Sequence, residues 1–168
     1  MHKPRELRQG VWYGVRTEVN IGEPLFRLPE AVVLLHRVLR KVKKFYPFEL
    51  RGLRLEGAWL VFYIRPEDGF QLPLIMQLVK QWFSLEFNGM TGRRGHLWGE
   101  RYGSEILEGE PPAREAAVDW AAIDKSANTP LPPAMAYTLT WDSLRSPGMT
   151  ITTSFSALNV AKTASPPR

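Results

Sequence analysis

The residues best suited to chemistry lie between Gly92 and Tyr102, in the stretch GRRGHLWGERY. Guanidinium groups and backbone N–H groups both donate hydrogen bonds to phosphate oxygens, so a basic glycine-rich loop is suited to hold phosphates. A solvated hairpin loop would have a similar composition. Because this loop is both basic and rich in glycine, we favour phosphate contact by Arg93 and Arg94, with Arg101 as a further cation beside them.

Metal chemistry has few candidate ligands in this chain. There is no cysteine, which excludes disulfides and thiolate metal sites. The three histidines, His2, His36 and His96, fall in separate segments. Scattered histidines are more often surface residues than ligands of one metal. Glu67 and Asp68 fit a turn, because no second acidic pair faces them in the pattern. We therefore expect neither a metal nor another cofactor.

Composition indicates one globular domain. The chain has 168 residues, of which 44% are hydrophobic and 23% charged. Its longest apolar runs, such as residues 59–64, are far shorter than the roughly 20 residues that cross a membrane. The first ten residues are basic but lack an apolar stretch typical of a signal peptide. These features predict a cytoplasmic protein without a membrane partner.

The positive charge is concentrated near the N-terminus. The net charge is +5, and residues 1–54 contain 12 Lys and Arg against 5 Asp and Glu. A positive surface attracts polyanions through counterion release, which favours nucleic acid as a partner. A solvated basic helix face is an equally good interpretation. The cations in question share one face of an expected helix and are Arg37, Arg40, Lys41 and Lys44.

Periodicity predicts a β-α-β-β-α-β order of elements. We expect strands over residues 10–20, 48–55, 58–64 and 96–107, and helices over 28–45 and 72–88. The stretch WLVFYI is apolar on both faces, so it should be a central, covered strand. This order is that of an α+β, ferredoxin-like fold with one antiparallel sheet and both helices on one face.

The pattern decays after residue 108. Residues 113–127 fit a short acidic helix, whereas residues 128–168 are dominated by Pro, Ser, Thr and Ala. Such a composition favours disorder. We therefore expect a domain over residues 8–127 and a largely disordered low-complexity tail over 128–168.

From Trp12 to Leu107 the chain resembles the insertion-sequence-200-like family of HUH transposases, which includes the REP-associated tyrosine transposases. Two stretches carry the resemblance, EPLFRLPEAVVLLHRVLRKVKKFYPFEL and GRRGHLWGERYGSEIL. The second is similar to the family's "GRxGHLWxxRY" strand. The resemblance implies single-stranded or hairpin DNA as a partner. Family members include dimers and monomers, so a homodimer stays open.

The resemblance also implies a chemistry whose residues are missing. In the family, a tyrosine attacks a DNA phosphate while a divalent metal, held by a His-x-His strand, stabilises the developing charge. Aligned without gaps, those histidines correspond to Trp59 and Val61, which offer no lone pair to a cation. Trp120 falls near the position of the nucleophile, and residues 104–136 contain no tyrosine. We expect no catalytic residues and no metal site.

Two functions follow, and a third is weaker. The first is a transposase-like DNA-binding domain that no longer nicks DNA. The second is a protein-interaction or structural module that keeps only the fold, with its former DNA groove filled by Trp59 and its neighbours. The least favoured is an active nuclease that uses Tyr102 or Tyr137 with another metal site.

Overall fold

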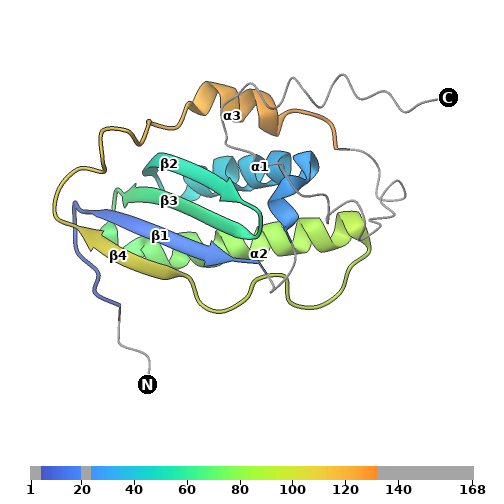
Figure 1. The fold of residues 1–168 in the computed structure, drawn as a ribbon, viewed down its shortest axis with the longest axis horizontal. Coiled ribbons are helices and arrows are strands. Elements are labelled where there is room, and N and C mark those ends of the chain that lie inside the picture. Colours follow the sequence, from blue (N-terminus) through green and yellow to red (C-terminus); the bar gives the residue numbers. More distant parts are fainter. Residues whose placement is uncertain (1–4, 20–23, 132–168) are drawn as a thin grey trace.

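The predicted order of elements is confirmed in the computed structural model, which describes residues 5–19 and 24–131 (Figure 1). The strands are β1 (Trp12–Glu18), β2 (Phe48–Glu56), β3 (Trp59–Pro66) and β4 (Gly103–Leu107). The helices are α1 (Pro29–Phe45), α2 (Leu72–Thr91) and α3 (Trp120–Ala127). Short 3-10 turns at Leu25–Arg27 and Gly69–Gln71 precede α1 and α2.

The four strands form one antiparallel sheet in the order β2-β3-β1-β4, with α1 and α2 behind it (Figure 1). This is the ferredoxin-like arrangement that the sequence predicts. Alternate residues of each strand face the helices, because successive side chains of a strand point to opposite sides. On β3 the inward residues are Leu60, Phe62 and Ile64, each at most 1% exposed.

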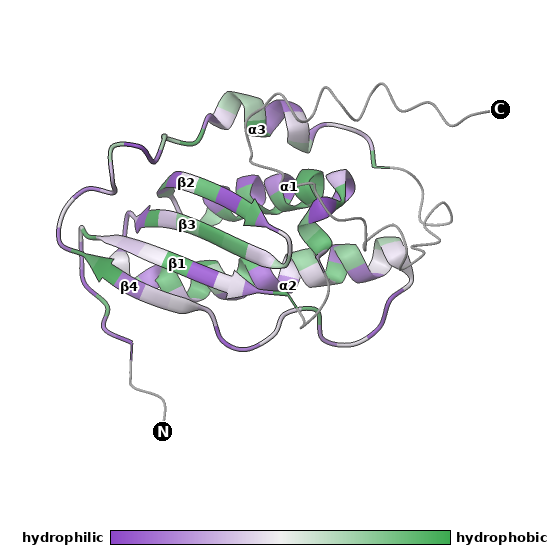
Figure 2. Ribbon diagram, in the orientation of Figure 1, coloured by the Kyte–Doolittle hydropathy of each residue, from purple (hydrophilic) through white to green (hydrophobic). Residues whose placement is uncertain are grey.

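The second face of β3 is not part of the core. Figure 2 colours most of this strand as hydrophobic, yet Trp59, Val61 and Tyr63 are only half-buried. The expectation of a strand covered on both faces is therefore wrong. Its position is central as predicted, between β2 and β1, but in the part of the chain that the structure describes the helices cover one face only. An apolar run is compatible with a strand that is covered on one face or on both, because hydrophobicity alone does not show whether a second layer exists.

Two glycines shape the β2–β3 hairpin. Gly57 has a φ of +63° in the turn that joins the strands, a conformation that residues with a Cβ rarely adopt. Gly52 has a φ of +57° and lies where the register shifts between Arg51 and Arg54. Two residues of β2 there oppose one of β3, which is a β-bulge. Another segment of the chain packs against this bulge, since Gly52 is hydrogen-bonded to Ala116.

The third helix packs against α1 and buries residues that the sequence places on a solvated face. His36 is 3% exposed, and its Nδ1 lies 2.9 Å from the Ser126 hydroxyl. Burial lowers the pKa of His36 to about 4, so the ring is neutral near pH 7. The prediction of a surface histidine is wrong for His36, because α3 supplies the cover that a helix-by-helix analysis lacks.

Other boundaries differ from prediction. α2 continues to Thr91, so the basic loop begins at Gly92. Strand pairing of the last strand covers only Gly103–Leu107, preceded by an isolated bridge between Val19 and Trp98. Phe45, the last residue of α1, is 64% exposed. The predicted disorder of residues 132–168, and Tyr137 with it, lies outside the described residues.

Candidate nucleic-acid interface

The two residues that the sequence resemblance aligns with metal ligands lie on the open face of the sheet. Trp59 and Val61 alternate with the core residues of β3, so they point away from the helices. The guanidinium carbon of Arg16 on β1 lies 3.8 Å from the centre of the Trp59 ring. This is a cation–π contact, in which the ring's electron-rich face attracts the positive charge. The indole at this position therefore holds a cation by stacking.

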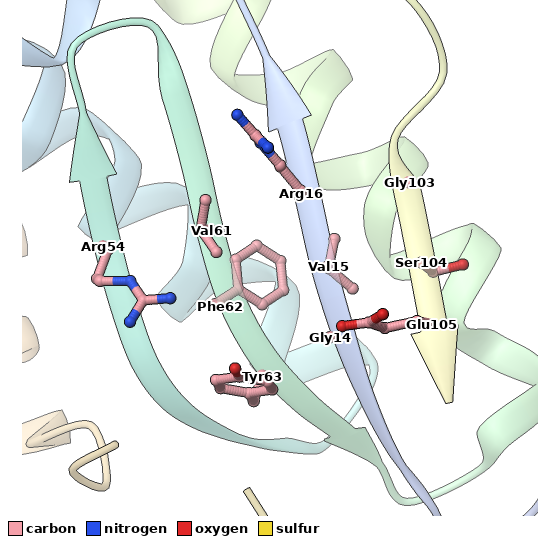
Figure 3. A pocket seen from close by; sticks show the side chains of 10 residues that line it. All are labelled: Gly14, Val15, Arg16, Arg54, Val61, Phe62, Tyr63, Gly103, Ser104 and Glu105. Carbon is pink, nitrogen blue, oxygen red and sulfur yellow. The ribbon is translucent and has the colours of Figure 1, made fainter. Parts of the chain in front are cut away.

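A hollow of about 430 Å³ lies beside Val61 on this open face. Figure 3 shows Arg54 and Tyr63 on one side of it, Glu105 on the other and Arg16 toward one end. Its size is within the range of small-molecule sites. The side chains offer guanidinium, phenol and carboxylate groups to a ligand. None of the residues that line it is a histidine.

Metal ligands do not gather anywhere in residues 5–19 and 24–131. No group of three or more His, Cys, Asp or Glu side chains in those ranges is placed to hold an ion. Trp59 and Val61 supply no nitrogen or oxygen to a cation at their own positions. The expectation that the protein binds no metal stays a prediction.

An acidic segment between β4 and α3 neutralises other arginines of the open face. We call residues 108–118 the acidic strap; it curves around one end of the sheet and reaches the β2 edge (Figure 1). Glu115, with a side chain 6% exposed, lies 2.6 Å from Arg54. Glu110 lies 3.2 Å from Arg51 and 3.4 Å from Arg65. These pairs lower the positive charge available to a ligand on this side of the sheet.

Backbone contacts fix the acidic strap to β2. The Gly52 N–H donates to the Ala116 carbonyl at 2.9 Å, and the Val118 N–H donates to the Leu50 carbonyl at 3.1 Å. A Cβ on Gly52 would lie 2.4 Å from a carboxylate oxygen of Glu115. The glycine bulge is therefore what allows the carboxylate to approach the sheet so closely.

The basic face of α1 is only partly available to a partner. The Arg37 guanidinium donates to the carbonyls of Ala127 and Thr129, at 3.2 and 3.1 Å. Arg40 forms a salt bridge of 2.5 Å with Asp124 of α3. Both arginines, predicted to bind DNA, thus hold α3 and the residues after it. Ion pairs with a later helix are invisible to a pattern read within one helix.

The other two cations of that helix are more accessible. Lys41 is exposed, with its ammonium group 4.2 Å from the centre of the Trp82 ring, and Lys44 is exposed as well. Trp82 is half-buried and packs edge-on against Phe45, with ring centres 5.8 Å apart. Trp82 therefore lies at the edge of the core and not within it. This end of α1 and α2 presents aromatic and basic groups together.

Two hydrogen bonds tie the basic loop after α2 to that helix. Asn88 donates to the Gly95 carbonyl at 3.1 Å, and the Trp98 indole N–H donates to the Lys80 carbonyl at 2.8 Å. Trp98 itself packs against Phe83 in the core. Before these two contacts Arg94 is exposed and Arg93 half-buried, and after them Arg101 is exposed. The loop therefore follows α2 and presents its arginines at the surface.

Trp120 begins α3 and lies away from the hollow. Its ring packs edge-on against Phe48 with ring centres 5.9 Å apart, and Lys43 lies 4.6 Å from its centre. Asp119 caps the helix by accepting hydrogen bonds from Ala121 and Ala122. Trp120 thus fastens α3 to the β2 edge.

Four basic residues near these surfaces were missing from the sequence-based site. Arg16 and Arg54 line the hollow, and Arg5 and Lys80 lie near the start of β4. The alternation of inward and outward residues along β1 and β2 indicates Arg16 and Arg54, since it places both side chains on the face opposite the core. No sequence signal connects Arg5 with Lys80, which are brought together only by the fold.

Comparison with known proteins gives one informative result. Neither a scan against protein-family models nor a search of curated proteins finds a match. Among solved structures, the fold is similar to that of a REP-associated tyrosine transposase determined in complex with a REP hairpin, with a TM-score of 0.56 and 14% identity. The similarity covers 66% of this chain and 64% of the other. The chain therefore has a transposase-like fold and spans about two thirds of that neighbour.

Proposed function

We propose that this protein is a DNA-binding domain of transposase-like fold that does not nick DNA. The observation that carries the proposal is the open sheet face at Trp59 and Val61, where the resemblance places metal ligands and where this chain has an indole and an isopropyl group. Without a cation to stabilise charge on a phosphate, binding would continue without phosphoryl transfer. The missing tyrosine in residues 104–136 supports the same conclusion.

The proposed partner is single-stranded or hairpin DNA. The structural neighbour is described as bound to a REP hairpin, and its fold is similar to this one. In this chain the proposed contacts are the cations of the loop after α2, Arg93, Arg94 and Arg101, of which Arg94 and Arg101 are exposed. Arg37 and Arg40 would contribute less, because each is already bonded to α3 or the residues after it.

A specific observation also favours the alternative, a protein-interaction or structural module. The acidic strap pairs with Arg51, Arg54 and Arg65, so one side of the open face is internally neutralised. Phe45 and Leu85 are 64% and 63% exposed on the helix side. Exposed apolar side chains of this size are suited to contact a protein.

Two assays separate the functions. Fluorescence anisotropy with labelled single-stranded and hairpin DNA, at several salt concentrations, should give binding that weakens steeply with salt under our proposal. Incubation with Mg²⁺ or Mn²⁺ followed by denaturing electrophoresis should give neither cleaved DNA nor a covalent adduct. Absence of binding at low salt would favour the interaction module, whereas a covalent adduct would show that the protein is an active enzyme.

A further inference from the structure

A group of cations gathers where the N-terminal segment meets the residues before β4. The Arg5 guanidinium donates to the Tyr102 carbonyl at 2.8 Å and lies 3.6 Å from the centre of the Tyr102 ring. The Lys80 ammonium donates to the Glu100 carbonyl at 3.0 Å. Arg101 stands between those two anchor residues in the chain. Two cations from distant segments are thus tied to a stretch of three residues that carries a third.

Arg5 and Lys80 are held by carbonyls and aromatic rings instead of carboxylates. Within residues 5–19 and 24–131, none of Arg5, Lys80 and Arg101 has a carboxylate oxygen within 4.0 Å. Two acidic residues adjoin the group in the chain. The Glu6 carboxylate pairs with Arg8, and Glu100 contacts Lys80 through its carbonyl oxygen. The contrast with the acidic strap is direct, since Glu110 and Glu115 neutralise the arginines on the other side of the sheet.

The positions of Arg5 and Lys80 are fixed before any ligand arrives. Lys80 is half-buried beside the Trp98 ring, and Trp98 donates to the carbonyl of the same lysine. Burial, and then the charge of Arg5, lower the pKa of Lys80. The positive charge of Arg5 therefore disfavours the protonated form of Lys80, and a bound anion would offset this repulsion. Preorganised cations lose little side-chain freedom on binding.

We propose that Arg5, Lys80 and Arg101 form a binding site for one phosphate group of a DNA backbone. The inference rests on the proposed function for its ligand, because DNA supplies the phosphate. Guanidinium forks and an ammonium group match the oxygens of a phosphodiester, and such contacts position a strand without reading its sequence. The site is distinct from the hollow beside Val61 and from the basic face of α1.

The geometry of α2 relates this site to the basic loop. Lys80 and Gly92 are twelve residues apart along the helix, which corresponds to about 18 Å at a rise of 1.5 Å per residue. The loop runs back from Gly92 toward β4 along α2 (Figure 1). At about 3.4 Å per nucleotide of a stacked strand, this distance covers about five nucleotides. One strand could therefore contact Arg94 at one end and the phosphate site at the other.

The test compares the full chain with the double variant Arg5→Gln/Lys80→Gln and with Arg114→Gln as a matched control. Arg114 has a side chain 82% exposed and lies in the acidic strap, away from the proposed site. Binding to labelled single-stranded DNA is measured from about 50 to 200 mM salt. We expect the double variant to bind several-fold more weakly, with a salt slope reduced by about 0.7, the value for one phosphate contact on a single strand. Arg114→Gln should match the parent.

Two further variants guard against a folding defect. Lys80→Arg keeps the charge and should keep the salt slope of the parent, and Arg101→Gln changes an exposed side chain and should weaken binding without changing the melting temperature. A double variant that binds DNA like Arg114→Gln would overturn the site and leave the proposed function intact.

A second ligand keeps the two proposals separable if the parent does not bind DNA. The proposed function would then fail, and inorganic phosphate at constant ionic strength would test the site alone. A phosphate-dependent rise in melting temperature that the double variant abolishes would support the site, because a ligand of the folded state stabilises it. An equal response of parent and double variant would refute it.

Discussion

Gly52 offers the sharpest test of how the acidic strap is attached. We expect Gly52→Ala to destabilise the protein for two separate reasons. Its φ of +57° is unfavourable for alanine, and the new Cβ would lie 2.4 Å from the Glu115 carboxylate oxygen and 3.2 Å from the Glu115 Cβ. Glu115 cannot move away freely, because it pairs with Arg54 at 2.6 Å.

Gly10 provides a control for the backbone contribution. Gly10 has a φ of +71°, but a Cβ there would meet nothing within 4 Å. A left-handed conformation costs a residue with a Cβ about 1–2 kcal/mol, and the smaller entropy of the unfolded chain offsets about 0.5 kcal/mol of this. We therefore expect Gly10→Ala to lower the free energy of unfolding by about 1 kcal/mol. Gly52→Ala should lower it by about 2–3 kcal/mol, since displacing Glu115 also weakens a partly exposed ion pair.

Urea denaturation of the two variants, alone and combined with Glu115→Ala, measures the contact directly. In the Glu115→Ala background the penalty of Gly52→Ala should fall toward that of Gly10→Ala, because the carboxylate is no longer in the way. Equal destabilisation by Gly52→Ala and Gly10→Ala in the parent would refute the reasoning. It would mean that the strap gives way at no cost and that its ion pairs contribute little.

Three further predictions concern the core, the open face and the loop. Burial lowers the pKa of His36 from 6.5 to about 4, so protonation of this ring opposes folding. The free energy of unfolding should therefore be highest above pH 6.5 and fall by up to about 3 kcal/mol as the pH drops toward 4. Denaturation of His36→Gln should show a flatter pH dependence. Phe62→Ala should lower the free energy of unfolding by about 3–5 kcal/mol, because it leaves a cavity in the core. Trp59→Ala should lower it by about 1–2 kcal/mol, because Trp59 is half-exposed. Thermal denaturation of both variants would show whether the open face is uncovered. The combined change of Arg93 and Arg94 to Ala should reduce the salt slope of single-stranded DNA binding by about 1–2 with an unchanged melting temperature, and an unaltered slope would exclude the loop from the interface.

Local patterns were enough to predict the elements of the fold. Periodicity gave both long helices to within a few residues and placed two strands in succession over residues 48–55 and 58–64, where β2 and β3 pair. The order β-α-β-β-α-β then left the ferredoxin-like sheet as the matching arrangement. The final strand was predicted too long, because pairing after the Val19–Trp98 bridge is interrupted where Lys80 holds Glu100.

The surface depended on contacts between distant segments, which no local pattern contains. Arg37 and Arg40 have the spacing of a solvated basic face, but α3 comes ninety residues later in the chain and bonds to that face. The same packing buries His36. Trp59 was expected to pack in the core, since its strand is apolar throughout, but within residues 5–19 and 24–131 no second helical layer covers it and it is half-exposed.

The carboxylates of the acidic strap occupy arginines on part of the open sheet face, as a bound anionic ligand would. Glu110 and Glu115 are tethered to the arginines they contact, so their effective concentration at Arg51, Arg54 and Arg65 is on the order of millimolar or higher. A dissolved monovalent anion must compete against that local supply. A strand with many phosphates gains several contacts at once and competes far better. This part of the sheet should therefore bind long polyanions in preference to free nucleotides and small anions.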